Sequence, residues 1–111
     1  MNPPQEPTSW VYMTSASLEE ARRIGKALVQ ERLVACVNLL PGMESLYWWE
    51  GEVTQGQEVV LVAKTPSRLV PALTTRVKAL HSYSCPCVVA VPIEQGNPDY
   101  LSWIVEETRQ K

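Results

Sequence analysis

The sequence predicts one α+β domain in which short strands and amphipathic helices alternate along 111 residues. Three observations support this: apolar runs of strand length, helix starts marked by capping residues, and one tight chain reversal between two strands. The resulting order is β-α-β-β-α-β-α. That order fits the ferredoxin-like split βαβ sandwich, with an antiparallel sheet and two helices on one face. We assign the domain to residues 9–111, and we expect the polar, proline-rich residues 1–8 to be a flexible tail.

The first half of the chain supplies a strand, a helix and a hairpin. Residues 10–14 are typical of a strand. Ser17 and Glu20 then form a capping box, in which the Ser17 hydroxyl accepts from the Glu20 amide and the Glu20 carboxylate reaches back, and a helix follows to about residue 31. We expect one continuing strand that includes residues 33–40 and 47–49. The chain reverses at Glu50-Gly51 and returns as a strand over residues 52–64.

The second half supplies a helix, a strand and a closing helix. Residues 65–67 open the second helix, so that Pro71 falls in its first turns, where proline is tolerated. Residues 87–91 are an apolar run that predicts a buried strand. Asn97, Pro98 and Asp99 give a cap, a proline and an acid, which together mark the start of the last helix.

Two of the predicted strands contain apolar residues at every position rather than at alternate positions. These are residues 59–63 and 88–91, and strands of this kind are buried on both faces. The helices cover mainly one face of the sheet. We therefore expect another copy of the chain to cover the other face, which predicts a homo-oligomer.

Composition narrows the possible functions. The net charge is −2 and no run of Lys and Arg stands out, which disfavours a nucleic-acid partner. No apolar stretch approaches the ~18 residues of a membrane span, and the N-terminal residues lack the pattern of a signal peptide. Three cysteines do not form a disulfide framework, so we expect a cytoplasmic, reduced protein. The sequence lacks the common nucleophile-elbow, P-loop and dinucleotide motifs, so we expect neither catalysis nor an organic cofactor.

Five spaced motifs stand out along the chain: LVACVN at 33–38, SLYWWEG at 45–51, KT at 64–65, HSY at 81–83 with Pro86, and YLSW at 100–103. Together they closely resemble the CutA divalent-cation-tolerance family. The resemblance runs from about residue 9 to residue 108. It implies a homotrimer and a cytoplasmic role in tolerance of divalent metals, notably copper. The alternative is a trimeric small-molecule sensor resembling the nitrogen-regulatory PII proteins, although the tight reversal at Glu50-Gly51 leaves no long mobile loop there.

The resemblance also suggests metal ligands. Some members of the family bind copper through a strand-end cysteine and two successive histidines, and the corresponding positions here hold Met13, Leu80 and His81. A methionine sulfur suits Cu(I), whereas leucine cannot bind a metal. His81 is the only histidine of the chain. A structural, hydrogen-bonding role is the alternative for it.

Cys85 and Cys87 flank Pro86 and depart from the family pattern. An extended backbone at the proline would place both sulfurs on one side, where they could bind Cu(I) or Zn(II) with His81 as a third ligand. The alternative, which we favour, is that both are small packing residues, and Cys36 is expected in the core. We therefore expect weak metal binding that depends mainly on His81.

The aromatic residues and one lysine suggest a second kind of site. Most of the aromatic side chains are expected in the core and at the subunit interface. Lys64 ends a buried strand, which is an unusual position for an ammonium group without a partner. The alternative to pure packing is a pocket between subunits where Trp49, Lys64, Tyr83 and His81 converge.

Overall fold

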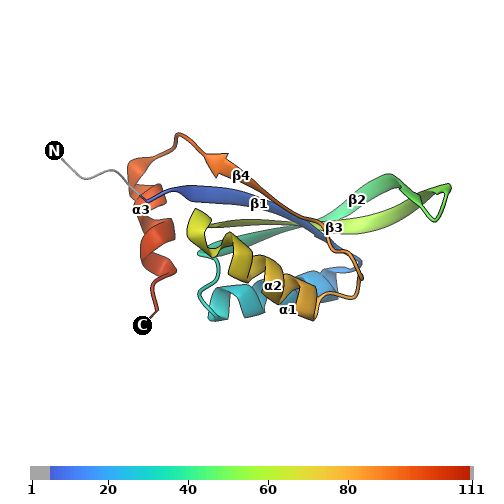
Figure 1. Cartoon of the computed structure of the whole chain (residues 1–111), viewed down its shortest axis with the longest axis horizontal. Coiled ribbons are helices and arrows are strands. Elements are labelled where there is room, and N and C mark those ends of the chain that lie inside the picture. The colour runs from blue at the N-terminus through green and yellow to red at the C-terminus, as the bar shows by residue number, and fades with distance from the viewer. Residues whose placement is uncertain (1–5, 111) are drawn as a thin grey trace.

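The computed structural model describes residues 6–110 and confirms the predicted α+β architecture (Figure 1). Four antiparallel strands form one sheet in the order β2-β3-β1-β4, and helices α1 and α2 lie together on one of its faces. In order, the elements are β1 (Thr8–Ser15), α1 (Leu18–Gln30), β2 (Cys36–Trp49), β3 (Glu52–Pro66), a short 3-10 helix η1 (Ser67–Leu69), α2 (Val70–Leu80), β4 (Val88–Ile93) and α3 (Pro98–Glu107). None of the helices in the described residues is both long and apolar enough to cross a membrane.

The N-terminal boundary of the domain lies slightly earlier than expected. Residues 1–5 of the predicted tail are outside the described residues. Glu6 pairs with Arg68, the Pro7 carbonyl accepts a hydrogen bond from the Ser67 amide, and β1 already begins at Thr8. Residues 6–8 are therefore attached to the domain by pairing with the start of η1.

The β2–β3 hairpin is the most elongated part of the molecule. Its turn contains only Glu50 and Gly51, with φ angles of 50° and 82°, which is the backbone of a type I′ turn. An irregularity between Leu40 and Met43 interrupts the register, and beyond it the hairpin projects away from the helices (Figure 1). β2 begins at Cys36 rather than at residue 33, because the Leu33 amide still bonds to the Leu28 carbonyl at the end of α1.

The two faces of the sheet have different surroundings. Val11, Met13, Leu61 and Ala63 point toward α1 and α2 and form the core. Strand alternation directs the intervening residues to the outer face, which carries Trp10, Tyr12, Leu40, Val60, Val62, Val89 and Val91. Val89 is 54% exposed and Val91 48% exposed. Within one chain, α1 and α2 thus cover only one side of the apolar strands, and α3 contacts the outer face near Cys36 through Tyr100.

Candidate functional site

The candidate site lies where the segment between α2 and β4 meets β1 and the projecting part of the β2–β3 hairpin. His81 is the C-cap of α2, and Tyr83 and Cys85 follow it on this segment. The site has two neighbouring parts, a polar network around His81 and a cleft beside Tyr83. Tyr83 belongs to both parts, because its backbone contacts His81 and its side chain lines the cleft.

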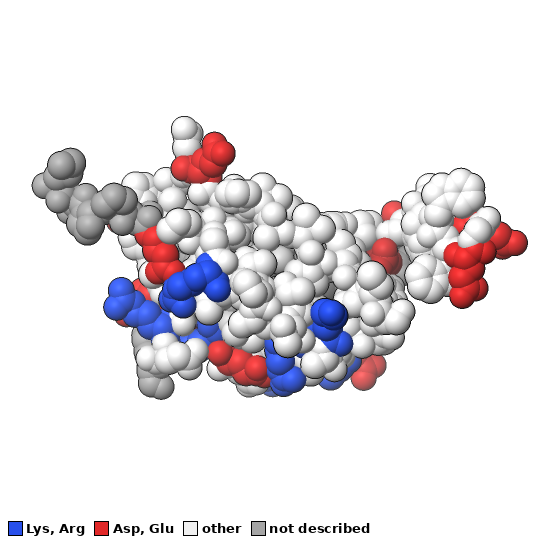
Figure 2. All heavy atoms as spheres, in the orientation of Figure 1, with Lys and Arg blue, Asp and Glu red and all other residues white. Residues whose placement is uncertain are grey.

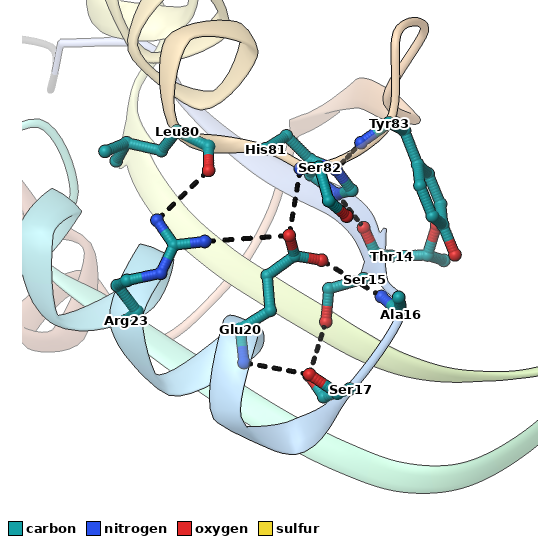
Figure 3. A network of polar contacts seen from close by, with 10 residues as sticks. All are labelled: Thr14, Ser15, Ala16, Ser17, Glu20, Arg23, Leu80, His81, Ser82 and Tyr83. Atoms are coloured by element: carbon teal, nitrogen blue, oxygen red, sulfur yellow. Dashed lines mark hydrogen bonds and ion pairs between the residues drawn. The ribbon is translucent and has the colours of Figure 1, made fainter.

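Both ring nitrogens of His81 are engaged by the backbone (Figure 3). Nε2 lies 2.7 Å from the Thr14 carbonyl oxygen, and Nδ1 lies 3.0 Å from the Tyr83 amide nitrogen. A carbonyl can only accept and an amide N–H can only donate, so Nε2 carries the proton and the Nδ1 lone pair accepts. A metal ion could bind this ring only by displacing one of these two partners. The structure thus gives His81 the structural role that was the alternative at the sequence level.

Glu20 is the buried carboxylate of this network (Figure 3). The predicted cap is confirmed in one half, since the Glu20 amide donates to the Ser17 hydroxyl over 3.1 Å. The carboxylate reaches one residue further back than expected, to the Ala16 amide, and its other oxygen accepts from the Ser82 amide over 2.9 Å. Burial raises the pKa of this carboxyl, but the hydrogen bonds from Ser82 and Ala16 outweigh it, so the pKa is lowered overall. Glu20 thereby links the start of α1 to the segment after α2.

A cleft of about 300 Å³ lies beside this network at the hairpin. Tyr47, Trp49, Glu58, Tyr83 and Cys85 line it. The Tyr83 hydroxyl donates to Glu58 Oε2 over 3.0 Å. Burial and this bond to the carboxylate raise the pKa of Tyr83 to about 12, so the hydroxyl remains a donor at neutral pH. Glu58 was not among the site residues predicted from the sequence, although its position directly before the apolar run 59–63 was a signal for it.

Lys64 does not join this cleft within one chain, so the predicted convergence, which was placed between subunits, stays a prediction. It lies on the outer face of β3 and donates to the Asn38 side chain on β2. Trp49 pairs with Glu52 at the other end of β3. Lys64 and Trp49 are therefore separated by about twelve positions of β3, or ~40 Å at ~3.3 Å per residue. Trp49 and Tyr83 do share the cleft, and the His81 ring lies 4.6 Å from the Tyr83 ring.

The four sulfur-containing residues considered from the sequence, Met13, Cys36, Cys85 and Cys87, lie in different environments. Met13 is 1% exposed and packs in the core. Cys85 is exposed and lines the cleft, whereas Cys87 is partly buried, and burial followed by the charge of Glu58 raises the pKa of its thiol. Cys36, expected in the core, instead lies on the outer face, with its sulfur 3.5 Å from the Tyr100 hydroxyl of α3. Over residues 6–110, no three His, Cys, Asp or Glu side chains are arranged to hold a metal ion.

The split βαβ sandwich with a long projecting hairpin defines a class of small α+β proteins, and the family model places the chain within it. Residues 9–107 match the model of the CutA1 divalent ion tolerance protein. The chain therefore belongs to the CutA1 family, as its motifs indicated.

Individual relatives agree with this assignment. A divalent-cation tolerance protein CutA from Thermus thermophilus is 53% identical over 98 residues, covering 88% of this chain and 95% of the relative. The human protein CutA is 43% identical over 100 residues, which is 90% of this chain. This chain spans only 56% of the human relative and 59% of a chloroplastic rice relative.

Solved structures share the fold over almost the whole chain. CutA1 from Oryza sativa has a TM-score of 0.93 at 44% identity, covering 96% of this chain and 98% of that one. A protein from Archaeoglobus fulgidus, described as a periplasmic divalent cation tolerance protein, has a TM-score of 0.89 at 42% identity. The similarity covers 92% of this chain and 99% of the Archaeoglobus chain.

Proposed function

We propose that this protein is a non-enzymatic, cytoplasmic homotrimer that takes part in tolerance of divalent metal ions, with copper as its metal. The observation that carries this proposal is the family match over residues 9–107, together with relatives named for divalent-cation tolerance. The geometry of the chain supports the individual parts of the proposal to different degrees.

The sheet supports the homotrimer. Its outer face bears an apolar row from all four strands, including the half-exposed Val89 and Val91. Leu46, Trp48 and Val53 on the projecting hairpin are more exposed still. Apolar surface of this extent is typical of a protein interface. Copies of the chain that cover one another's outer faces would bury both sets of residues.

The donor atoms favour a soft metal ion, and they change the expected order of the ligands. Met13 is sealed in the core and both nitrogens of His81 are engaged, so neither offers a free donor atom. Cys85 does, because it is exposed. Thiolates are preferred ligands of Cu(I). We therefore place Cys85 first, with Cys87 as its partner, and His81 no longer dominates.

Copper binding to this pair would be weak and would depend on pH. Each thiol must lose its proton to bind Cu(I), and the raised pKa of Cys87 opposes that loss at neutral pH. Affinity should therefore increase as the pH rises. Such behaviour suits a protein that responds to excess metal rather than one that stores it.

Other features support the cytoplasmic and non-enzymatic parts of the proposal. All three thiols are unpaired in the structure, which suits a reducing compartment. The backbone engages both nitrogens of the only histidine, so this ring is not free to act as a general base. The two-residue turn at Glu50-Gly51 disfavours the PII-like alternative, since it holds the hairpin closed.

Native mass spectrometry with and without Cu(I), Cu(II) and Zn(II) tests the whole proposal. We expect a species of about three times 12.5 kDa that gains copper, preferentially as Cu(I). His81→Ala should keep this gain, and the double change Cys85→Ser, Cys87→Ser should lose it. A species that gains no copper, or one that loses copper only in His81→Ala, would contradict the proposed ligands.

A further inference from the structure

We propose that the cleft lined by Tyr47, Trp49, Glu58, Tyr83 and Cys85 binds a small organic cation of the ammonium class. Cys85, the first copper ligand proposed above, also lines this cleft, but the recognition chemistry of the cation rests on the aromatic rings and one carboxylate and does not need bound copper. Three of its five lining residues are aromatic, and they come from two separate elements.

The rings are arranged around one space. Tyr47 and Trp49 lie two residues apart on β2 and therefore point to the same face of the hairpin. Tyr83 approaches the cleft from the segment between α2 and β4. Gly56 on β3 leaves room beneath Tyr47, whose hydroxyl lies 3.7 Å from the position that a Cβ of residue 56 would take. Aromatic faces that line a partly enclosed space attract cations through their quadrupoles.

The electrostatic surroundings favour positive charge. Residues 33–63, which include the whole projecting part of the hairpin, contain four glutamates and no Lys or Arg, and the first lysine of β3 is Lys64 near its end. In Figure 2 the projecting hairpin shows acidic residues and no basic residue on the visible face. Glu58 brings one of these carboxylates into the cleft. The Tyr83 hydroxyl bonds to only one of the two oxygens of this carboxylate. Among the described residues of one chain, a ligand cation in the cleft would thus meet a carboxylate and no Lys or Arg along the lining.

The same lining disfavours a hard metal ion as the ligand. Mg²⁺ and Ca²⁺ need several oxygen ligands, whereas Glu58 is the only carboxylate that lines the cleft over residues 6–110. An ammonium group with methyl substituents needs a single counter-charge and apolar walls. The volume of about 300 Å³ is at the lower end of the ~300–1,000 Å³ found for small-molecule pockets, which suits a small ligand.

Choline and its neutral isostere 3,3-dimethylbutan-1-ol provide the test. They have nearly the same shape and differ in the charge of the quaternary centre. Isothermal titration of the assembled wild-type protein should show saturable, millimolar choline binding. The alcohol should bind at least about tenfold more weakly, since it loses the cation–π and carboxylate attraction. Equal binding of the two compounds, or no saturable choline binding, would overturn the proposal.

Paired variants locate the binding to the cleft. Glu58→Gln removes the charge but keeps an oxygen that can accept from Tyr83, and Trp49→Leu removes one ring. Each should weaken choline binding about tenfold. The controls are Glu50→Gln, at the hairpin turn, and Trp48→Leu, whose side chain points to the opposite face and is 75% exposed. If the controls weaken choline binding as much as the cleft variants do, the assignment to this cleft is wrong.

Discussion

Replacing Glu20 with alanine should destabilise the protein far more than replacing its neighbour Glu19. Glu20 is 7% exposed, and its carboxylate accepts hydrogen bonds from the Ala16 amide (3.1 Å) and the Ser82 amide (2.9 Å). Glu19 is exposed on the same turn of α1. The two substitutions remove the same charge from the same helix end and differ in the hydrogen bonds that they break.

The magnitude follows from these contacts. A hydrogen bond to a charged group contributes ~1.5–3 kcal/mol, and two are lost in Glu20→Ala. The pair with Arg23, at 3.6 Å and half exposed, adds little. Since both amides can partly regain water, we expect a loss of about 3 kcal/mol for Glu20→Ala. Glu19→Ala should cost less than ~1 kcal/mol, through the helix dipole alone.

The effect should also depend on pH in one direction. The pKa of Glu20 is lowered on folding, so its contribution is fully present above its ordinary value of 4.5. It is lost as the pH falls through the lower pKa of the folded state. Urea unfolding at one fixed protein concentration, at pH 7 and near pH 3, measures both effects. Equal losses for Glu20→Ala and Glu19→Ala, or a Glu20→Ala loss that does not shrink in acid, would refute this reasoning.

Three further predictions concern the turn, the thiols and the last helix. Gly51→Val should lower stability by about 1 kcal/mol or more in thermal melts, since residue 51 has a φ of 82°, and an unchanged melting temperature would contradict this. In Cu(I) competition titrations, the double change Cys85→Ser, Cys87→Ser should abolish binding that His81→Ala retains, and the affinity of the wild type should rise between pH 6 and about pH 9. Asn97→Ala should cost ~1 kcal/mol in urea unfolding, because its side chain accepts from the Asp99 amide at the start of α3; a loss near zero would exclude a capping role.

Local chemistry explains why most of the fold could be predicted from the sequence. Ser17 caps α1, Asn97 caps α3, and Glu50-Gly51 forms the turn, because each feature depends on residues within a few positions. The start of β2 was predicted too early, at residue 33. An apolar run does not reveal that the Leu33 amide still forms a hydrogen bond to the last turn of α1. Arg32, with a φ of 61°, makes the sharp change of direction there, and an arginine gives no sequence signal for it.

The candidate site was less accessible to sequence reasoning, because its contacts join distant segments. Glu20 bonds to Ser82 and Glu58 to Tyr83, across 62 and 25 residues. Lys64 was expected to meet Trp49 between subunits; within one chain the length of β3 separates the two residues, and Asn38 on the neighbouring strand bonds to Lys64. Cys36 was expected in the core on the basis of its apolar neighbours, whereas strand alternation places it on the outer face beside Tyr100.

The association state of the chain tests the central claim most directly, because both the apolar outer face of the sheet and the family role depend on it. Sedimentation equilibrium at micromolar concentration measures the mass without assumptions about molecular shape. A homotrimer should have a mass of about three times 12.5 kDa, and this mass should not fall when the protein is diluted. A species of 12.5 kDa would contradict the account, because Val89, Val91 and the exposed aromatic residues of the hairpin would then remain in water.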